Sequence, residues 1–273
     1  MKKYLLSSLS VMVYLLLCLA LVLYFLNSTS SLKKEKNPLP KTQTVPKHKK
    51  PNIAKPLPPL PLPKKEIDLI DVDFEKRLED IDAKVGDPVF IRIFKEESLL
   101  EVWIKPADEY LLFKQYPICA FSGHLGPKLK EGDKQSPEGF YKVTKHLLNP
   151  KSKFHLAFNL GYPNAYDKAH KRTGSYLMVH GACVSVGCYA MTNAKIEEIY
   201  KLVDQALKDG QKYVQVHAFP FRMTEENMAE HEGSQWYDFW TELKEGYDYF
   251  EAEKLPPHIM VKRKHYTIHE ANE

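Results

Sequence analysis

Hydrophobic residues in the middle of the chain occur in short runs separated by polar loops, a spacing typical of β-strands. The runs Val89–Phe94 and Leu99–Ile104 flank the polar stretch Lys95–Ser98, which predicts an antiparallel hairpin. Further runs predict strands over residues Leu111–Ala120, Phe140–Thr144, Phe154–Phe158, Tyr176–His180 and Tyr213–Ala218. The sequence therefore predicts a fold that is rich in β-structure in its middle.

Three segments repeat their apolar residues at the three- and four-residue spacing of an amphipathic helix. The first starts at Phe74. The second covers Ile196–Leu207 and has Thr192 or Asn193 as its N-cap. The third is the aromatic segment Thr224–Lys254, whose spacing is typical of core packing or of a docking face. Together with the strands, these helices predict a mostly β fold of the α+β class.

Residues 4–26 form an uncharged apolar run that follows Lys2 and Lys3. The run is long enough for a helix that crosses a bilayer, which takes roughly 20 residues. We therefore interpret residues 1–26 as a transmembrane signal anchor. A cleaved signal peptide is the alternative, because the small polar residues 27–30 leave a cleavage site open.

Residues 27–65 are rich in proline and lysine, which predicts a disordered linker with polyproline II character. The first 65 residues contain twelve lysines and one acid, whereas the net charge of the whole chain is +4. The remainder of the chain is therefore acidic. An acidic folded part argues against a nucleic-acid partner, because nucleic-acid-binding proteins carry a basic face on the fold itself.

The residues best suited to chemistry concentrate after the predicted strand that ends at His180. The following loop carries Ser185, Gly187 and Cys188 and leads into a predicted helix. A cysteine needs only a nearby base such as His180 to become a thiolate, which is its nucleophilic form. A glycine such as Gly187 lets backbone N–H groups approach a reacting carbonyl, as an oxyanion hole requires.

Two other uses of these side chains are compatible with the sequence. His180, Cys183 and Cys188 could bind zinc with His217 as a fourth ligand, although structural zinc sites usually combine two close cysteine pairs. A disulfide, for instance between Cys119 and Cys183, is plausible in an oxidising compartment. That pairing would leave Cys188 free, so it does not exclude catalysis.

The motif His180-Gly followed by Ser185-x-Gly-Cys188 resembles the signature of the YkuD-type L,D-transpeptidase catalytic domain family, and its longer spelling resembles the YafK branch of that family. Further segments resemble the same branch over residues Phe121–Lys128, Gln135–Tyr141, Asn159–Asp167 and Arg172–Gly174. Two positions depart from the usual pattern. Val186 stands where a second histidine is usual, and Ala190 stands where arginine or asparagine is usual.

The resemblance implies an L,D-transpeptidase-like β-sandwich catalytic core with flanking helices, in the periplasm and anchored in a bacterial inner membrane. It implies that Cys188 is the nucleophile, that His180 is the general base, and that Gly187 and Ser185 belong to the catalytic loop. Thioester chemistry of this kind needs neither a metal nor another cofactor. The expected division of the chain is an anchor (1–26), a linker (27–65), a catalytic domain (66–222) and a C-terminal helical extension (223–273).

The resemblance also implies a reaction on peptidoglycan stem peptides through a thioester on Cys188. In the YafK branch it indicates hydrolysis that frees a wall-attached lipoprotein from diaminopimelate. Val186 and Ala190 agree with hydrolysis, because neither offers a charge or a hydrogen bond to an amine acceptor. A true transpeptidase that crosslinks peptidoglycan is one alternative, and an inactive wall-binding module is another. The inner membrane, reached through residues 4–26, would be the second partner.

Five residues are candidates for binding the substrate: Tyr162, Asn164, Tyr166, Arg172 and Arg222. The first four lie in a polar and aromatic loop before the strand that ends at His180. Arg222 follows a later strand and could pair with a carboxylate of diaminopimelate. His217 could orient the catalytic pair, although a structural role is the simpler interpretation.

Overall fold

The computed structural model describes residues 69–271. The predicted membrane anchor, residues 1–26, and the predicted linker, residues 27–65, lie outside these residues. Within 69–271, no helix combines the length and the apolar character that a membrane span requires. The description below therefore concerns the region in which the candidate chemistry lies.

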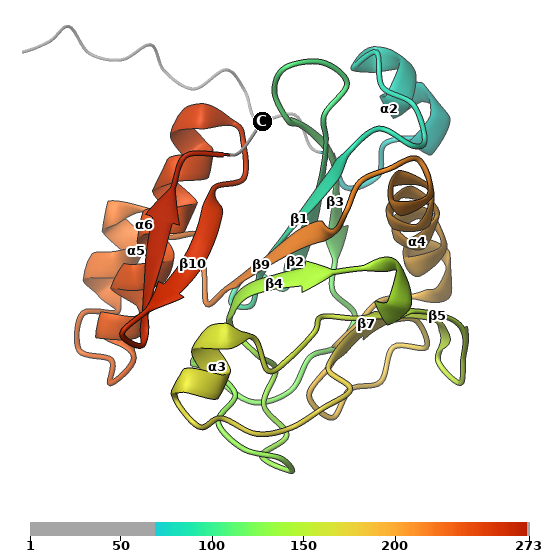
Figure 1. Ribbon diagram of the computed structural model, residues 1–273. Coiled ribbons are helices and arrows are strands. Elements are labelled where there is room, and N and C mark those ends of the chain that lie inside the picture. Colours follow the sequence, from blue (N-terminus) through green and yellow to red (C-terminus); the bar gives the residue numbers. More distant parts are fainter. Residues whose placement is uncertain (1–68, 272–273) are drawn as a thin grey trace, which may run out of the picture. The chain divides into compact units, whose positions relative to one another are not determined.

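Five strands form the central sheet in the spatial order β3-β2-β1-β9-β4 (Figure 1). Their bounds are Val89–Phe94 for β1, Leu99–Ile104 for β2, Leu111–Pro117 for β3, Gly139–Val143 for β4 and Val214–Phe219 for β9. Neighbouring strands are antiparallel except β1 and β9, which are parallel. The predicted hairpin of β1 and β2 is confirmed, because Phe94 pairs with Leu99 across its turn.

Both faces of this sheet are covered by helices (Figure 1). Every residue of β1 is buried. Ile91 and Ile93 belong to the core shared with α4 (Asn193–Lys208), whereas Phe94 belongs to a second core shared with α6 (Tyr237–Glu253). Burial on both faces explains why β1 is a nearly continuous apolar run instead of an alternating one.

A second sheet of four short strands carries the loop with the candidate chemistry. Its order is β5 (Leu148–Ser152), β6 (His155–Asn159), β7 (Met178–His180) and β8 (Tyr189–Ala190), and the short helix η2 (Lys145–Leu147) precedes it. Strands β7 and β8 are parallel, with His180 opposite Ala190. His180, at the end of β7, therefore lies two residues from Cys188 across the strand pair, because β8 directly follows Cys188.

Helix α4 contacts strands of both sheets, β6 and β1. The side chain of Thr192 accepts a hydrogen bond from the Lys195 N–H, so the predicted N-cap is confirmed. The predicted apolar face of this helix is buried. Helix α2 (Phe74–Asp80) begins at Phe74, as predicted. Helix α3 (Ala165–Ala169) is a short helix that the sequence pattern does not predict.

The C-terminal part departs from the helical extension expected over residues 223–273. Its elements are α5 (Glu225–Glu230), α6 (Tyr237–Glu253), β10 (His258–Lys262) and β11 (His265–His269), the last two forming an antiparallel hairpin. Lys254 takes a left-handed conformation that closes α6. Pro256 and Pro257 follow, and proline cannot continue a helix.

Four aromatic residues of α6, namely Phe239, Trp240, Tyr247 and Phe250, are buried in the protein. Trp240, Phe250 and Leu243 are buried, and Trp240 packs edge-on against Phe221 at 5.2 Å between ring centroids. The aromatic pattern of this segment therefore reflects core packing. The described residues together form a mixed α+β fold in which helices and two sheets share the cores.

Candidate active site

His180 ends β7 with its side chain almost fully buried, at 2% exposure. Its Nδ1 lies 2.6 Å from the carbonyl oxygen of Gly181, and its ring stacks on Phe154 with 4.7 Å between centroids. A carbonyl can only accept, so Nδ1 carries the hydrogen of the neutral ring and Nε2 presents its lone pair. Burial lowers the pKa of His180, which keeps the imidazole neutral and able to take a proton.

Cys188 has the free thiol among the cysteines that the structure describes. The hydroxyl groups of Ser136 and Ser185 donate to its carbonyl oxygen, at 3.2 and 2.7 Å. Its Sγ lies 3.6 Å from the carbonyl oxygen of Tyr176 and faces a pocket of about 220 Å³. The backbone around the thiol is thus fixed, while the sulfur remains accessible to a small group.

The resting ionisation of this thiol is set by opposing effects. Burial raises the pKa of Cys188, while the Met178 N–H and the positive charge of Lys128 act to lower it. Within residues 69–271, no hydrogen bond joins the ring of His180 to the sulfur of Cys188. The lowered pKa of His180 and the raised pKa of Cys188 both favour the neutral forms at rest, and hydrogen bonds between a nucleophile and its base often tighten only when substrate binds.

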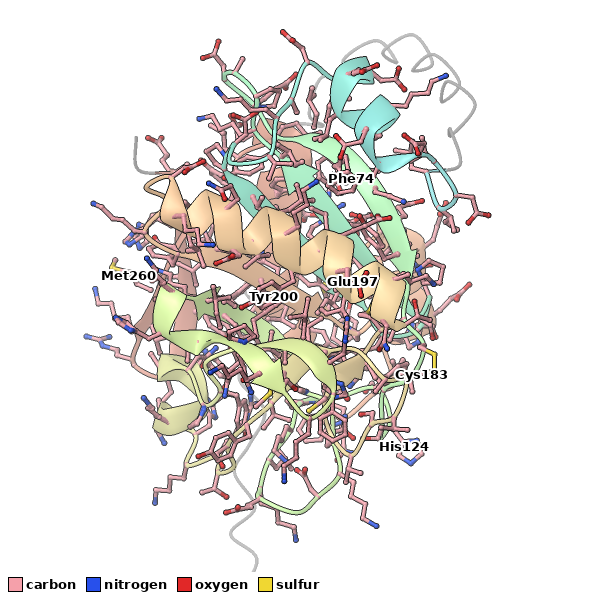
Figure 2. The ribbon with its side chains drawn as sticks, turned by 90° about the vertical axis from the view of Figure 1, so that its right-hand side faces the viewer. Phe74, His124, Cys183, Glu197, Tyr200 and Met260 are labelled. Atoms are coloured by element: carbon pink, nitrogen blue, oxygen red, sulfur yellow. A yellow bond between two sulfur atoms is a disulfide. The ribbon has the colours of Figure 1, made fainter. Side chains whose placement is uncertain are left out.

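A disulfide between Cys119 and Cys183 ties the loop 181–188 to the chain that follows β3, with 5.2 Å between the Cα atoms. Of the two uses that the sequence leaves open for Cys183, this confirms the disulfide. The Asn193 side chain accepts the Ala182 N–H and the Met191 carbonyl accepts the Cys183 N–H, so the loop is also held by hydrogen bonds. Figure 2 shows Cys183 at the edge of the protein opposite Met260 of β10.

The turn before the candidate nucleophile Cys188 has a backbone conformation that favours glycine. Gly187 has a φ of 118°, and a Cβ at this position would lie 3.2 Å from Cδ1 of Leu177. The Gly187 N–H donates to Ser185 Oγ at 3.2 Å. Its place in the loop is therefore the expected one, and its role as an oxyanion donor stays a prediction.

Cys183 is not available as a ligand in the zinc site that the sequence left open, because its sulfur is bonded to Cys119. His217 is fully buried between the rings of Phe90 and Phe140, whose centroids lie 4.7 and 4.6 Å from its own. Among the residues that the structure describes, no group of three or more His, Cys, Asp or Glu is arranged to hold a metal ion. The packing of His217 supports a structural role in the sheet.

Three of the candidate substrate contacts hold the fold together around α3. The hydroxyl of Tyr162 donates to the carbonyl oxygen of Lys128 at 3.2 Å. Asn164 is the N-cap of α3. The ring of Tyr166 stacks on Tyr266 with 4.2 Å between centroids. These groups have partners inside the protein, so their contact with a substrate stays a prediction.

The two candidate arginines are ion-paired inside the fold. Arg172 Nη1 lies 2.9 Å from Asp167 Oδ1, and Arg222 Nη2 lies 2.6 Å from Glu101 Oε1. Neither arginine lines the pocket beside Cys188. The structure therefore does not bring these two side chains together with the thiol, and the predicted contact of Arg222 with a substrate carboxylate gains no support from its geometry.

The pocket beside Cys188 contains residues that the sequence does not single out as site residues. They are Lys128, Glu131, Gly132, Lys134, Gly174, Ser175, Tyr176 and Leu177. Val186, which departs from the usual family pattern, lines the pocket as well. Lys128 and Gly174 lie in segments that carry the family resemblance, which was the available signal for them. Nothing in the sequence marks Tyr176, although its side chain is 73% exposed and its φ is 57°.

The sequence of this chain matches a known domain family and two known proteins. The family described as YkuD, L,D-transpeptidase catalytic domain, matches residues 88–216. The protein named "Putative L,D-transpeptidase YafK" from Escherichia coli (strain K12) is 52% identical over 184 residues, which are 67% of this chain and 75% of that protein. The protein of the same name from Escherichia coli O157:H7 matches to the same extent.

Solved structures give weaker matches. The helical cell shape determining protein Pgp2 (K307A mutant) from Campylobacter jejuni is 22% identical with a TM-score of 0.41, and the match covers 62% of each chain. Bd1075 from Bdellovibrio bacteriovorus is 22% identical with a TM-score of 0.36, over 60% of this chain and 58% of that chain.

Proposed function

The chain belongs to the YkuD family of L,D-transpeptidase catalytic domains, and on that basis we propose that Cys188 performs acyl transfer on peptidoglycan stem peptides. The observation that carries this proposal is the position of the free thiol. It lies on a pocket, directly before the strand that pairs with the end of β7, where a neutral His180 presents Nε2. A thiol and an imidazole so placed are the nucleophile and base that thioester formation requires.

The proposed first half-reaction moves one proton twice. His180 Nε2 takes the proton from Cys188 Sγ, and the thiolate attacks an amide carbonyl carbon of the stem peptide. The C–N bond then breaks, and the leaving amine receives the proton from His180. The Gly181 carbonyl oxygen at 2.6 Å from Nδ1 keeps the ring in the tautomer and orientation that both transfers need. A thioester on Cys188 remains.

We propose that water resolves this thioester and that the substrate is a lipoprotein attached to the wall through diaminopimelate. Holding an amine acceptor in attack geometry needs a charged or hydrogen-bonding group near the sulfur, since orientation is worth about 7–11 kcal/mol in favourable cases. Val186 is apolar and 74% exposed on this pocket, while Ala190 is fully buried. Arg172 and Arg222 could have supplied such a group, but they form ion pairs with Asp167 and Glu101 inside the fold.

When the protein is given a lipoprotein-linked muropeptide and an excess of diaminopimelate-containing acceptor, we expect hydrolysed product to exceed crosslinked dimer by at least tenfold. The reason is that water is abundant and the amine is not oriented. The measurement is mass spectrometry of the products, with a disaccharide-tetrapeptide as a second donor. A majority of dimer would overturn the hydrolytic proposal and leave the acyl-transfer proposal standing.

Crosslinking is the second candidate because one observation favours it. Lys134 is exposed and lines the pocket beside Cys188, where its ammonium could bind the carboxylate of an acceptor. If dimer does form, Lys134→Met should reduce the ratio of dimer to hydrolysed product. An unchanged ratio would exclude Lys134 as the acceptor-binding group.

We also propose that residues 1–26 anchor the chain in the bacterial inner membrane and that residues 27–65 tether the folded part on the periplasmic side. The lysines of that linker are opposite in charge to the acidic remainder of the chain. The chain should sediment with the membrane fraction, and protease added to spheroplasts should degrade the part beyond residue 65. Protection from that protease would contradict the periplasmic placement.

A further inference from the structure

Lys128 is a buried lysine beside the candidate nucleophile, with no role in the mechanism described so far. It is 4% exposed. Its ammonium donates to the carboxylate of Asp133 and, at 2.9 Å, to the carbonyl oxygen of Lys130. An ammonium has three N–H donors, and these contacts use two of them. The charge is therefore fixed in place without all of its donors being occupied.

Asp133 organises the whole turn from which Lys128 starts. Its carboxylate accepts the backbone N–H groups of Leu129, Lys130 and Gln135, at 2.9, 3.0 and 3.1 Å, besides the Lys128 ammonium. The Asp133 carboxylate therefore accepts four hydrogen bonds, of which only one comes from the Lys128 ammonium. These contacts hold the turn 128–135 rigid, and with it the position of the Lys128 charge.

The segment Arg172–Gly174, which the proposed mechanism does not use, packs against the Lys128 side chain and the turn that carries it. Gly174 has a φ of 135°, and a Cβ there would lie 2.7 Å from Cε of Lys128. Thr173 fastens the turn from the other side: its Oγ1 accepts the Glu131 N–H at 3.1 Å, and its N–H donates to the Leu129 carbonyl oxygen at 3.0 Å. The stem of Lys128 therefore lies against Gly174, where a side chain would strain the backbone and displace the lysine.

Lys128 and Cys188 line the same pocket. The other charged side chains of that pocket, Glu131 and Lys134, are both exposed to solvent, so water screens their charges more than it screens a buried ammonium. His180 makes no hydrogen bond to the sulfur in the described structure, so a second positive group in the pocket would add to the stabilisation of a thiolate before the pair closes up. A lysine near a cysteine is a common source of that stabilisation.

We propose that Lys128 is a positioning residue that stabilises the Cys188 thiolate by its fixed positive charge, while His180 takes the proton. This inference rests on the proposed function in one respect, namely that Cys188 is the nucleophile. Lys128 transfers no proton and forms no bond in the reaction. Its charge favours the state in which the sulfur is negative and the imidazole has become an imidazolium.

The test is the pH dependence of Cys188 alkylation by iodoacetamide in the full chain, carried out in a Cys18→Ser background under non-reducing conditions. Cys119 and Cys183 are then blocked by their disulfide, so one thiol reacts. Lys128→Met keeps the length of the side chain and removes its charge, and it should move the midpoint of the alkylation profile upward by about 1 pH unit. Lys130→Met, in the same turn with an exposed side chain, should leave the midpoint in place.

Two further variants separate charge from fold. Lys128→Arg keeps the positive charge and should retain most of the wild-type midpoint, whereas Gly174→Ala displaces the lysine stem and should shift the midpoint in the same direction as Lys128→Met. An unmoved midpoint in Lys128→Met, or equal shifts in Lys128→Met and Lys128→Arg, would overturn the inference. Alkylation requires no turnover of peptidoglycan, so failure of the proposed function would appear separately, as an inactive protein with a normal midpoint shift.

Discussion

Replacement of Cys188 by alanine is expected to lower product release from a lipoprotein-linked muropeptide by at least about 10⁴-fold. Without the sulfur no thioester can form, and removal of a covalent nucleophile from comparable enzymes costs this much or more. The measurement is the rate of product formation by mass spectrometry with full-length protein. Because Cys188 is only partly buried and its backbone is held through its carbonyl oxygen, the variant should keep the circular dichroism spectrum of the wild type.

The matched control is the pair of cysteines in the disulfide. A Cys119→Ala, Cys183→Ala double variant removes the bridge, which should cost about 2–4 kcal/mol of stability, but it leaves the proposed nucleophile Cys188 in place. We expect it to retain measurable turnover at temperatures where it is folded. Equal loss of activity in this double variant and in Cys188→Ala would contradict the assignment of Cys188 as the sole nucleophile.

Replacement of Lys95 by methionine is expected to lower the free energy of unfolding by about 3–5 kcal/mol, since breaking a buried ion pair leaves one charge without its partner. The ammonium of Lys95 is fully buried, 2.9 Å from the carboxylate of Glu138, and it also donates to the carbonyl oxygens of His124, Gly126 and Ser136. Urea unfolding followed by circular dichroism measures the change. Thermal unfolding of the same samples provides an independent check.

Two comparisons show whether burial of the pair is the cause. Lys201→Met breaks an exposed ion pair with Glu75 and should cost less than about 1 kcal/mol. Combining Lys95→Met with Glu138→Gln removes the unpaired charge and should recover part of the loss. If Lys95→Met proved no more damaging than Lys201→Met, the buried pair would not be what holds residues 124–138.

Elements with strong local signals were predictable from the sequence. Helix α4 combines a capping threonine with a regular apolar face, and the hairpin of β1 and β2 combines two apolar runs with a polar turn. The hairpin of β10 and β11 was missed because its turn lacks a glycine or asparagine. Arg263 and Lys264 occupy the turn with positive φ angles of 50° and 71°. Positions with positive φ in two-residue hairpin turns are usually glycine, asparagine or aspartate, so the sequence gives no turn signal there.

Within the candidate site, too, residues with a local sequence signal could be predicted, whereas residues placed by distant contacts could not. The candidate nucleophile Cys188 and the candidate base His180 could be named from the sequence because both lie in one short motif, and their catalytic roles stay predictions. Lys128 could not be assigned, because its place in the pocket beside Cys188 depends on contacts with residues far along the chain, such as Gly174. Arg222 looked available to a ligand because nothing near it in sequence reveals that Glu101, on another strand, already neutralises it.

The C-terminal helices bear on how this protein can be divided and recombined. Trp240 of α6 donates from Nε1 to the carboxylate of Glu138 at 2.8 Å, and a Cβ on Gly246 would lie 2.6 Å from the ring of Phe140. Residues 88–216, which match the family, thus have part of their core covered by α6, a helix that lies after the end of this segment. We therefore expect that a gene fusion or domain exchange that kept Cys188 but discarded α6 would uncover the ring of Phe140 and leave the Glu138 carboxylate without its Trp240 donor.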